Sequence, residues 1–332
     1  MNKTLRNVLQ YVFFLGLGIF LLWWSAKDLT PEQTIELKRS LAGTRLIYVL
    51  PAMTLLLLSH YSRALRWKIL IEPLGYNPST LNTFFAVMVG YLFNLFVPRL
   101  GEVMKCTILG KYEKVPADKL VGTIVAERAF DVIMLVAVII FTIFTQVNII
   151  GEYTSRTFSK FFHDKAGHFS MSMILITVAG IILFFALAWW LINRFTHHAL
   201  VQKLKAIFNG IMMGLTSVRF IKNKGWFLFH TLFIWAMYLV SVRLGLFAMD
   251  AVSHLGWRAS LSVLSFGSVA FIVTQGGIGA YQLAIQKLMP LYGINEADGL
   301  GFGWVMWAAQ TGIILVAGFT CLAMLPAFNR KK

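Results

Sequence analysis

The amino-acid sequence predicts an all-α protein that crosses a membrane several times, and two observations carry this prediction. Hydrophobic residues make up 58% of the 332 residues, whereas charged residues make up only 13%. Several apolar runs are about 18 to 25 residues long, which is the length that a helix needs to cross ~30 Å of hydrocarbon. The predicted fold class is therefore a polytopic α-helical membrane protein.

Eight apolar segments follow one another along the chain. The first comes after Lys3 and Arg6, and its run from Val8 to Trp24 lacks a convincing small-residue cleavage site of a secretory signal peptide. We therefore expect an uncleaved first span. The segments cover 7–25, 46–66, 80–97, 119–146, 171–193, 225–248, 259–274 and 300–325, and two shorter semi-apolar stretches cover 99–112 and 278–290.

The distribution of Lys and Arg decides which segments cross, because positively charged loops favour the cytoplasmic side. If all eight crossed, the basic stretch 194–224 would lie outside. If 80–97 and 259–274 instead enter the membrane and return through 99–112 and 278–290, most of the 30 Lys and Arg residues are cytoplasmic. The sequence thus predicts six full transmembrane helices plus two re-entrant helical hairpins. Both termini would then be cytoplasmic, with the protein in the cytoplasmic (inner) membrane.

This arrangement predicts an inverted-topology repeat within one integral membrane domain, 1–332. Residues 1–149 would run as two spans, a re-entrant hairpin and a span, and residues 171–325 would repeat this order from the opposite side. Transporters commonly use such repeats, with broken helices that meet near the bilayer midplane. Broken backbone at this depth is tolerated only where protein buries it or a cavity wets it.

Several polar positions are expected at the membrane surface. Residues 31–42 suit a short surface helix on the outer side, and residues 197–222 suit either a basic amphipathic helix on the cytoplasmic leaflet or an ordinary positive loop. Arg63 and Arg66 lie near the cytoplasmic end of the second span, and we interpret them as interface anchors whose heads reach water. Arg243, near the outer end of its span, has the same interpretation.

Charged side chains gather between Pro98 and Asp131, inside segments that are otherwise apolar. An ionisable group in hydrocarbon costs several kcal/mol, so such groups usually line a polar path or pair with one another. Arginine suits phosphate, because its planar fork binds two oxygens at once. The competing interpretation is a structural clamp that pins the hairpin to the next helix. The six residues, whose formal charges sum to zero, are Arg99, Glu102, Lys105, Glu127, Arg128 and Asp131.

A glycine-rich turn follows the segment 259–274. Glycine permits positive φ, and free backbone N–H groups at a helix start hold anions. Glycine in membrane helices also serves close packing, which is the alternative explanation. We expect the turn and the next helix to contribute Gln275, Gly276, Gly277, Gly279 and Gln282 to a substrate site.

Other functional classes lack support in the sequence. The net charge of +16 is explained by membrane topology and by attraction to anionic headgroups rather than by nucleic acid. Cys106 and Cys321 lie in separate apolar segments and predict neither a disulfide framework nor a metal site. There is no Walker A loop, His-Glu-x-x-His or Gly-x-Ser-x-Gly motif. We expect no cofactor, no metal and no enzymatic activity.

Four motifs resemble the lysylphosphatidylglycerol synthase transmembrane family, which includes the flippase half of the bacterial multiple-peptide-resistance factor. The resemblance covers roughly 1–325. It implies movement of a lipid between leaflets along a path lined by Arg99, Glu102, Glu127, Arg128, Asp131 and the glycine turn. The motifs are Arg66-Trp67, Pro98-Arg99-Leu100-Gly101-Glu102, Glu127-Arg128-Ala129-Phe130-Asp131 and Gly276-Gly277-Ile278-Gly279.

The sequence departs from the usual pattern of this family in two places. Gln275 stands where many relatives have proline, and Gln282 stands where many have glutamate. The sequence ends at Lys332, which leaves no room for the soluble aminoacyl-transferase domain of the synthase. We therefore expect no lysyl transfer by this chain.

Three functional hypotheses remain from the sequence. The first is a flippase-like transporter for an anionic membrane lipid, of the phospholipid or polyprenyl-phosphate type. The second is an integral-membrane enzyme that acts on a lipid-linked substrate. The third is a non-transporting partner subunit that docks a soluble or membrane transferase through 197–222. A homo-oligomer is compatible with each.

Overall fold

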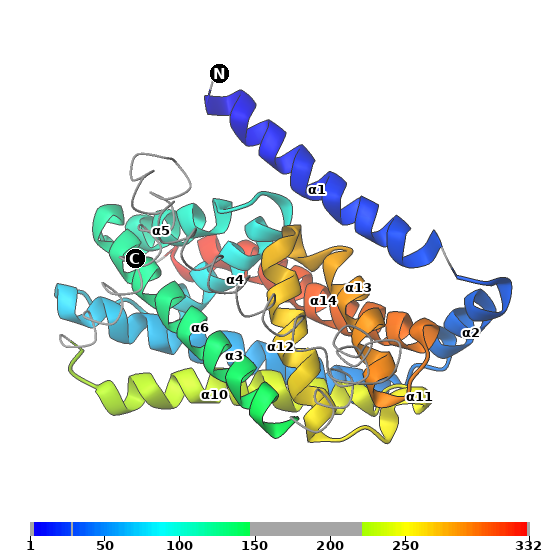
Figure 1. Ribbon diagram of the computed structural model, residues 1–332. Coiled ribbons are helices and arrows are strands. Elements are labelled where there is room, and N and C mark those ends of the chain that lie inside the picture. Colours follow the sequence, from blue (N-terminus) through cyan, green and yellow to red (C-terminus); the bar gives the residue numbers. More distant parts are fainter. Residues whose placement is uncertain (1–2, 28, 147–220, 331–332) are drawn as a thin grey trace, which may run out of the picture.

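The computed structural model describes residues 3–27, 29–146 and 221–330, and every regular element in them is helical (Figure 1). The helices of the first part are α1 (Lys3–Lys27), α2 (Pro31–Ala42), α3 (Leu46–Ile71), η1 (Glu72–Leu74), α4 (Thr80–Phe96), α5 (Leu100–Glu113) and α6 (Ala117–Thr145). Those of the second part are α10 (Lys224–Leu246), α11 (Asp250–Ser253), α12 (Trp257–Val273), η3 (Gln275–Gly277), α13 (Ala280–Leu288), η4 (Met289–Tyr292) and α14 (Glu296–Phe328).

Two helical hairpins dominate the architecture, and each ends in a break that its sequence explains. The first joins α4 to α5. Pro98 favours an extended residue before it, and Val97 has φ −135° and ψ 124°. Arg99 then turns the chain with φ 65°, a left-handed conformation that few residues other than glycine adopt. Helices α4 and α5 pack against each other, as expected for the predicted hairpin of 80–97 and 99–112.

The second hairpin joins α12 to α13 through η3. Thr274 is extended, and positive φ values follow at Gly276 (61°), Gly277 (72°) and Gly279 (74°). At Gly279 glycine is required twice, because an added Cβ would also collide with the backbone carbonyl of Gly18 in α1. This close approach packs α1 against α13 and η3.

The two hairpins meet at their tips. The Gln275 side chain donates a hydrogen bond to the backbone carbonyl of Asn94, in the last turn of α4. A methyl group added to Gly276 would lie 3.2 Å from Leu95 Cδ2, so the turns approach closely here. Trp307 of α14 donates its indole N–H to the Gly276 carbonyl over 2.8 Å, which fixes the second tip against a long helix.

Long helices pack beside the hairpins (Figure 1). Helix α10 packs along α3, α14 packs against α13, α4 and α2, and α6 contacts α3, α5 and α12. One buried apolar cluster joins α3, α4, α5 and α6, and a second joins α10, α12, α13 and α14. The first cluster therefore includes both helices of the α4–α5 hairpin, and the second includes both helices of the α12–α13 hairpin.

Length and composition identify fewer membrane spans than the sequence predicts. Within the described residues, α10 and α14 are long and apolar enough to cross a membrane. A third span results if α2 and α3–η1, which are bent by 72°, count as one. The predicted six spans and the inverted repeat stay predictions, since the expected span 171–193 and nearly all of the basic segment 197–222 lie outside the described residues.

The predicted surface segment 31–42 is a helix with clear ends. Thr30 caps α2, since its hydroxyl accepts from the Gln33 N–H and its own N–H donates to the Gln33 side chain. Pro31 occupies the first turn, where no N–H is needed. No residue of α2 is buried, yet the helix packs against α14.

Candidate functional site

A buried ion cluster joins α3, α5 and α6. Its centre is Glu127 of α6, whose side chain is only 1% exposed. One carboxylate oxygen accepts from Lys105 Nζ of α5 at 2.8 Å. The other accepts from Arg63 at 3.1 Å and lies 3.7 Å from an Arg66 nitrogen, both in α3. A single carboxylate therefore connects three helices.

Asp131 extends the cluster by one turn of α6, because residues four apart share a helix face. It accepts from Arg66 at 2.6 Å and also from Arg63. Each arginine also donates to α10, Arg63 to Tyr238 over 3.3 Å and Arg66 to Thr231 over 3.4 Å. Each arginine thus bridges α6 and α10 from its position on α3.

The interpretation of Arg63 and Arg66 as interface anchors is wrong. Arg63 is 5% exposed and Arg66 is fully buried, and both guanidinium groups point into the protein toward the acids of α6. The sequence held one signal for this arrangement. Ser59, His60 and Ser62 precede the two arginines within an apolar segment, and all three are buried. The polar face of α3 therefore already lies inside the protein before the chain reaches Arg63.

The two arginines also change the charge balance. The six residues chosen from the sequence are neutral as a set, but among the residues that the structure describes the buried cluster has three cations facing two carboxylates. Burying an unbalanced charge is unfavourable unless a counterion or water reaches it. The buried set is Arg63, Arg66, Lys105, Glu127 and Asp131.

The cluster opens toward the surface at Arg128 and Glu102. Their side chains are 43% and 30% exposed, and Arg128 donates to Glu102 over 3.0 Å. A second Arg128 nitrogen lies 4.0 Å from Asp131, which connects this outer pair to the buried cluster. Arg99 is exposed at the hairpin tip and makes no hydrogen bond or ion pair within the described part of the chain.

The glycine turn is arranged differently from the expectation. The N–H groups of Gly277 and Ile278 donate to the carbonyls of Thr274 and Gln275, and the Gly279 N–H donates to the Gln282 side chain at 2.9 Å. These three N–H groups are therefore not free to hold an anion in this conformation. Gln282, which we expect to contribute to the substrate site, is fully buried, and its side-chain nitrogen has no hydrogen-bond partner among the described residues.

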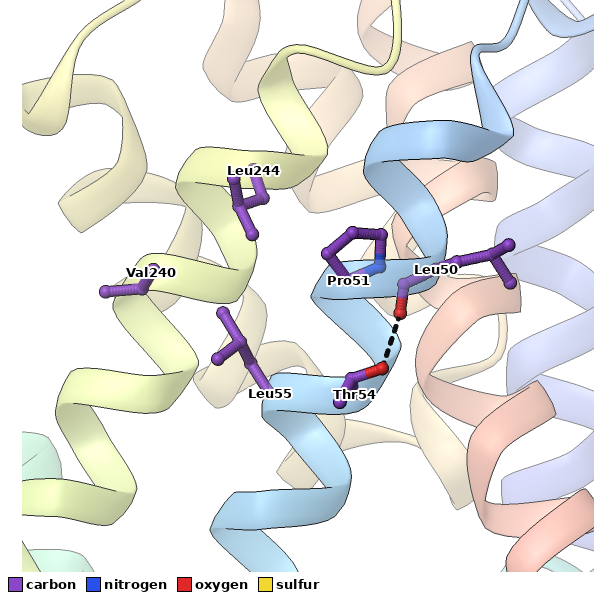
Figure 2. A pocket seen from close by; sticks show the side chains of 6 residues that line it. All are labelled: Leu50, Pro51, Thr54, Leu55, Val240 and Leu244. Carbon is purple, nitrogen blue, oxygen red and sulfur yellow. Dashed lines mark hydrogen bonds between the residues drawn. The ribbon is translucent and has the colours of Figure 1, made fainter.

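An apolar groove lies elsewhere on the surface, between α3 and α10 (Figure 2). It has a volume of about 550 Å³, and its one polar side chain, Thr54, already donates to the Leu50 carbonyl. This groove suits hydrocarbon but offers no charge to a headgroup. The lining residues are Leu50, Pro51, Thr54, Leu55, Val240 and Leu244.

The charged residues therefore divide into two groups with different chemistry. The buried cations and acids cross-link α3, α5 and α6, as the clamp interpretation expects. Arg128 and Glu102 are accessible enough to exchange partners, and Arg99 has an available guanidinium. The clamp interpretation thus accounts for the buried part of the cluster, whereas the outer part leaves charged groups within reach of a ligand.

Comparison with known proteins gives one relative and one family. Over 94 residues the chain is 33% identical to "UPF0104 membrane protein MJ1595" of Methanocaldococcus jannaschii. The matched region spans 27% of this chain and 28% of that relative's length. No solved structure matches the chain. Residues 8–318 match the family described as the lysylphosphatidylglycerol synthase TM region, and the chain therefore belongs to this family of membrane proteins.

Proposed function

We propose that this protein is a flippase-like transporter that moves an anionic lipid between the leaflets of the cytoplasmic membrane. The lipid is a phospholipid or a polyprenyl phosphate. The observation that carries this proposal is the excess of positive charge in the buried cluster, which continues outward to the accessible Arg128.

The charge excess gives an anion a reason to bind here. Glu127 and Asp131 leave one positive charge of the buried cluster unbalanced. A phosphate that reaches Arg128 balances this charge. The guanidinium plane of arginine presents two parallel N–H groups to two phosphate oxygens, and such charge-assisted pairs are stronger than neutral hydrogen bonds. Arg99 stands at the hairpin tip with its guanidinium exposed, in position to meet an arriving headgroup.

No chemical step is part of the proposal, and it needs no cofactor. The anionic lipid is the main partner. A separate transferase that supplies or consumes the lipid is a further proposed partner, and a homo-oligomer is compatible with the site.

Lipid transfer in liposomes tests the proposal. The protein is reconstituted with fluorescent phosphatidylglycerol, and the label in the outer leaflet is bleached with a membrane-impermeant reductant. The wild type should move the inner-leaflet label outward faster than empty liposomes do. Arg128→Gln removes one charge-assisted bond, worth about 1.5–3 kcal/mol, so transfer should fall by about 10- to 150-fold.

Arg45→Gln is the matched control, because Arg45 forms an exposed ion pair with Asp250 that lies outside the cluster. It should transfer lipid like the wild type. The proposal fails if the wild type accelerates none of a panel of lipid phosphates, or if zwitterionic phosphatidylcholine crosses as fast as the anionic lipids. A new lipid product in the same liposomes would instead indicate an enzyme.

A further inference from the structure

Asn94, which the sequence analysis did not single out, lies where the charged cluster and both hairpin tips meet. It is in the last turn of α4 and forms three hydrogen bonds to three different residues. Its side-chain oxygen accepts the Gly101 N–H at 2.8 Å, its side-chain nitrogen lies 3.5 Å from a Glu102 oxygen, and its backbone carbonyl accepts from Gln275.

The contact with Gly101 explains why α5 begins where it does. Arg99 precedes α5 without a capping side chain, so the first N–H groups of this helix need another acceptor. Asn94 supplies it from the preceding helix. A Cβ on Gly101 would lie 2.6 Å from Asn94 Cγ, so only glycine lets the two helices approach this closely. Asn94 therefore holds the first turn of α5, which carries Glu102.

Glu102 connects Asn94 to the accessible cation. One of its oxygens is shared between Asn94 and Arg128. Its other oxygen is buried and has no hydrogen-bond partner among the described residues. An anion that binds Arg128 competes for the bond that stabilises this carboxylate. A displaced Glu102 would be a partly buried charge without its cation, which favours movement of the α5 turn toward water.

We infer that the Asn94 side chain is a positioning residue that couples anion binding at Arg128 to contact between the two hairpin tips. The first turn of α5 moves with Glu102, and Asn94 is bonded to that turn on one side and to Gln275 on the other. Release of Glu102 thus weakens the contact of the first hairpin with the glycine turn. The inference rests on the proposed function, since it needs Arg128 to take an anion.

Such coupling is reciprocal. If anion binding separates the tips, weakening the tip contact must strengthen anion binding by the same factor, typically about 5- to 150-fold. Gln275→Leu removes the tip hydrogen bond without touching the cluster. It should therefore tighten binding of a soluble short-chain anionic lipid, and this effect should disappear when the Asn94 side chain no longer transmits it.

A double-mutant cycle on binding tests the inference. Dihexanoyl phosphatidylglycerol is titrated by calorimetry into the wild type, Gln275→Leu, Asn94→Leu and the double variant, each as the full chain in detergent. Gln275→Leu should lower the Kd about fivefold or more in the wild type but change it by no more than about twofold in the Asn94→Leu background. Equal tightening in both backgrounds, or none in either, overturns the inference.

A replacement variant and a comparison of lipid binding with lipid transfer distinguish the possible outcomes. Asn94→Ala, which removes both the acceptor for Gly101 and the donor to Glu102, replaces Asn94→Leu if that variant does not fold by circular dichroism and size exclusion. It should also abolish the effect of Gln275→Leu. Lipid binding without transfer in liposomes would refute the proposed transport while the cycle still decides the coupling. No binding by the wild type would refute both.

Discussion

Glu127→Gln tests how strongly the buried cluster holds α3, α5 and α6 together. The substitution keeps the shape of the side chain but removes its charge. The new amide oxygen can still accept from Arg63, whereas the amide NH₂ replaces the oxygen that lies 2.8 Å from Lys105 Nζ. Two donors then face each other in a site that is 1% exposed. Breaking a buried ion pair on one side costs about 3–5 kcal/mol, and we expect this loss in the free energy of unfolding.

Equilibrium unfolding by denaturant in mixed micelles measures this loss. Glu296→Gln is the matched control, because Glu296 pairs with Lys287 at the same 2.8 Å but the side chains are 40% and 56% exposed. Exposed pairs contribute about 0–1 kcal/mol, so the control should lose no more than that. Adding Lys105→Met to Glu127→Gln removes the unpaired ammonium and should recover part of the stability, by about 0.5–3 kcal/mol.

If Glu127→Gln loses no more stability than Glu296→Gln, the buried cluster does not hold the three helices together. If Lys105→Met adds its full cost to that of Glu127→Gln, the two effects are independent, and the two residues do not share an interaction.

Two further substitutions address the turn and the arginines. Gly279→Ala forces a side chain into φ 74° and against α1, so it should destabilise the protein by about 1–3 kcal/mol. The control Gly225→Ala should not destabilise it, because a Cβ there meets nothing within 4 Å. Thermal unfolding in detergent compares the two variants. The lysine in Arg66→Lys cannot form hydrogen bonds to Asp131 and Thr231 at the same time, so the free energy of unfolding should fall by about 1–3 kcal/mol, measured with denaturant. Arg45→Lys, at an exposed ion pair, should change the free energy of unfolding by less than about 1 kcal/mol. Equal effects within either pair would contradict the corresponding explanation.

The helices and both hairpin turns could be predicted from local features of the sequence. Pro98 sets an extended residue before it, and a run of glycines marks positive φ, so each break follows from the conformations that its own residues allow. The ends of α4 and α12 accordingly agree with the predicted segments 80–97 and 259–274 within a few residues. The spacing of Glu127 and Asp131 likewise places both on one face of α6.

The partners of these residues could not be predicted in the same way. The distance of Arg63 and Arg66 from the end of an apolar segment predicts that both lie at the membrane surface. Their partners are more than 60 positions later in the chain, and no local pattern connects them. The role of Asn94 could not be predicted for the same reason, because it depends on contacts with Gln275 and Gly101 that only the folded chain makes.

The class of this protein, the positions of the described helices and hairpin turns, and the family could all be predicted from the amino-acid sequence. These follow from hydropathy, from the fixed φ of proline and the conformational freedom of glycine, and from the order of the motifs, all of which can be recognised in short stretches of sequence. The folded structure was needed to show which cations face which acids, that the described cluster has more positive than negative charge, and that one asparagine joins both hairpin tips to it. Charge balance in a buried site depends on every group that packing brings within a few ångströms, and packing is a property of the folded chain.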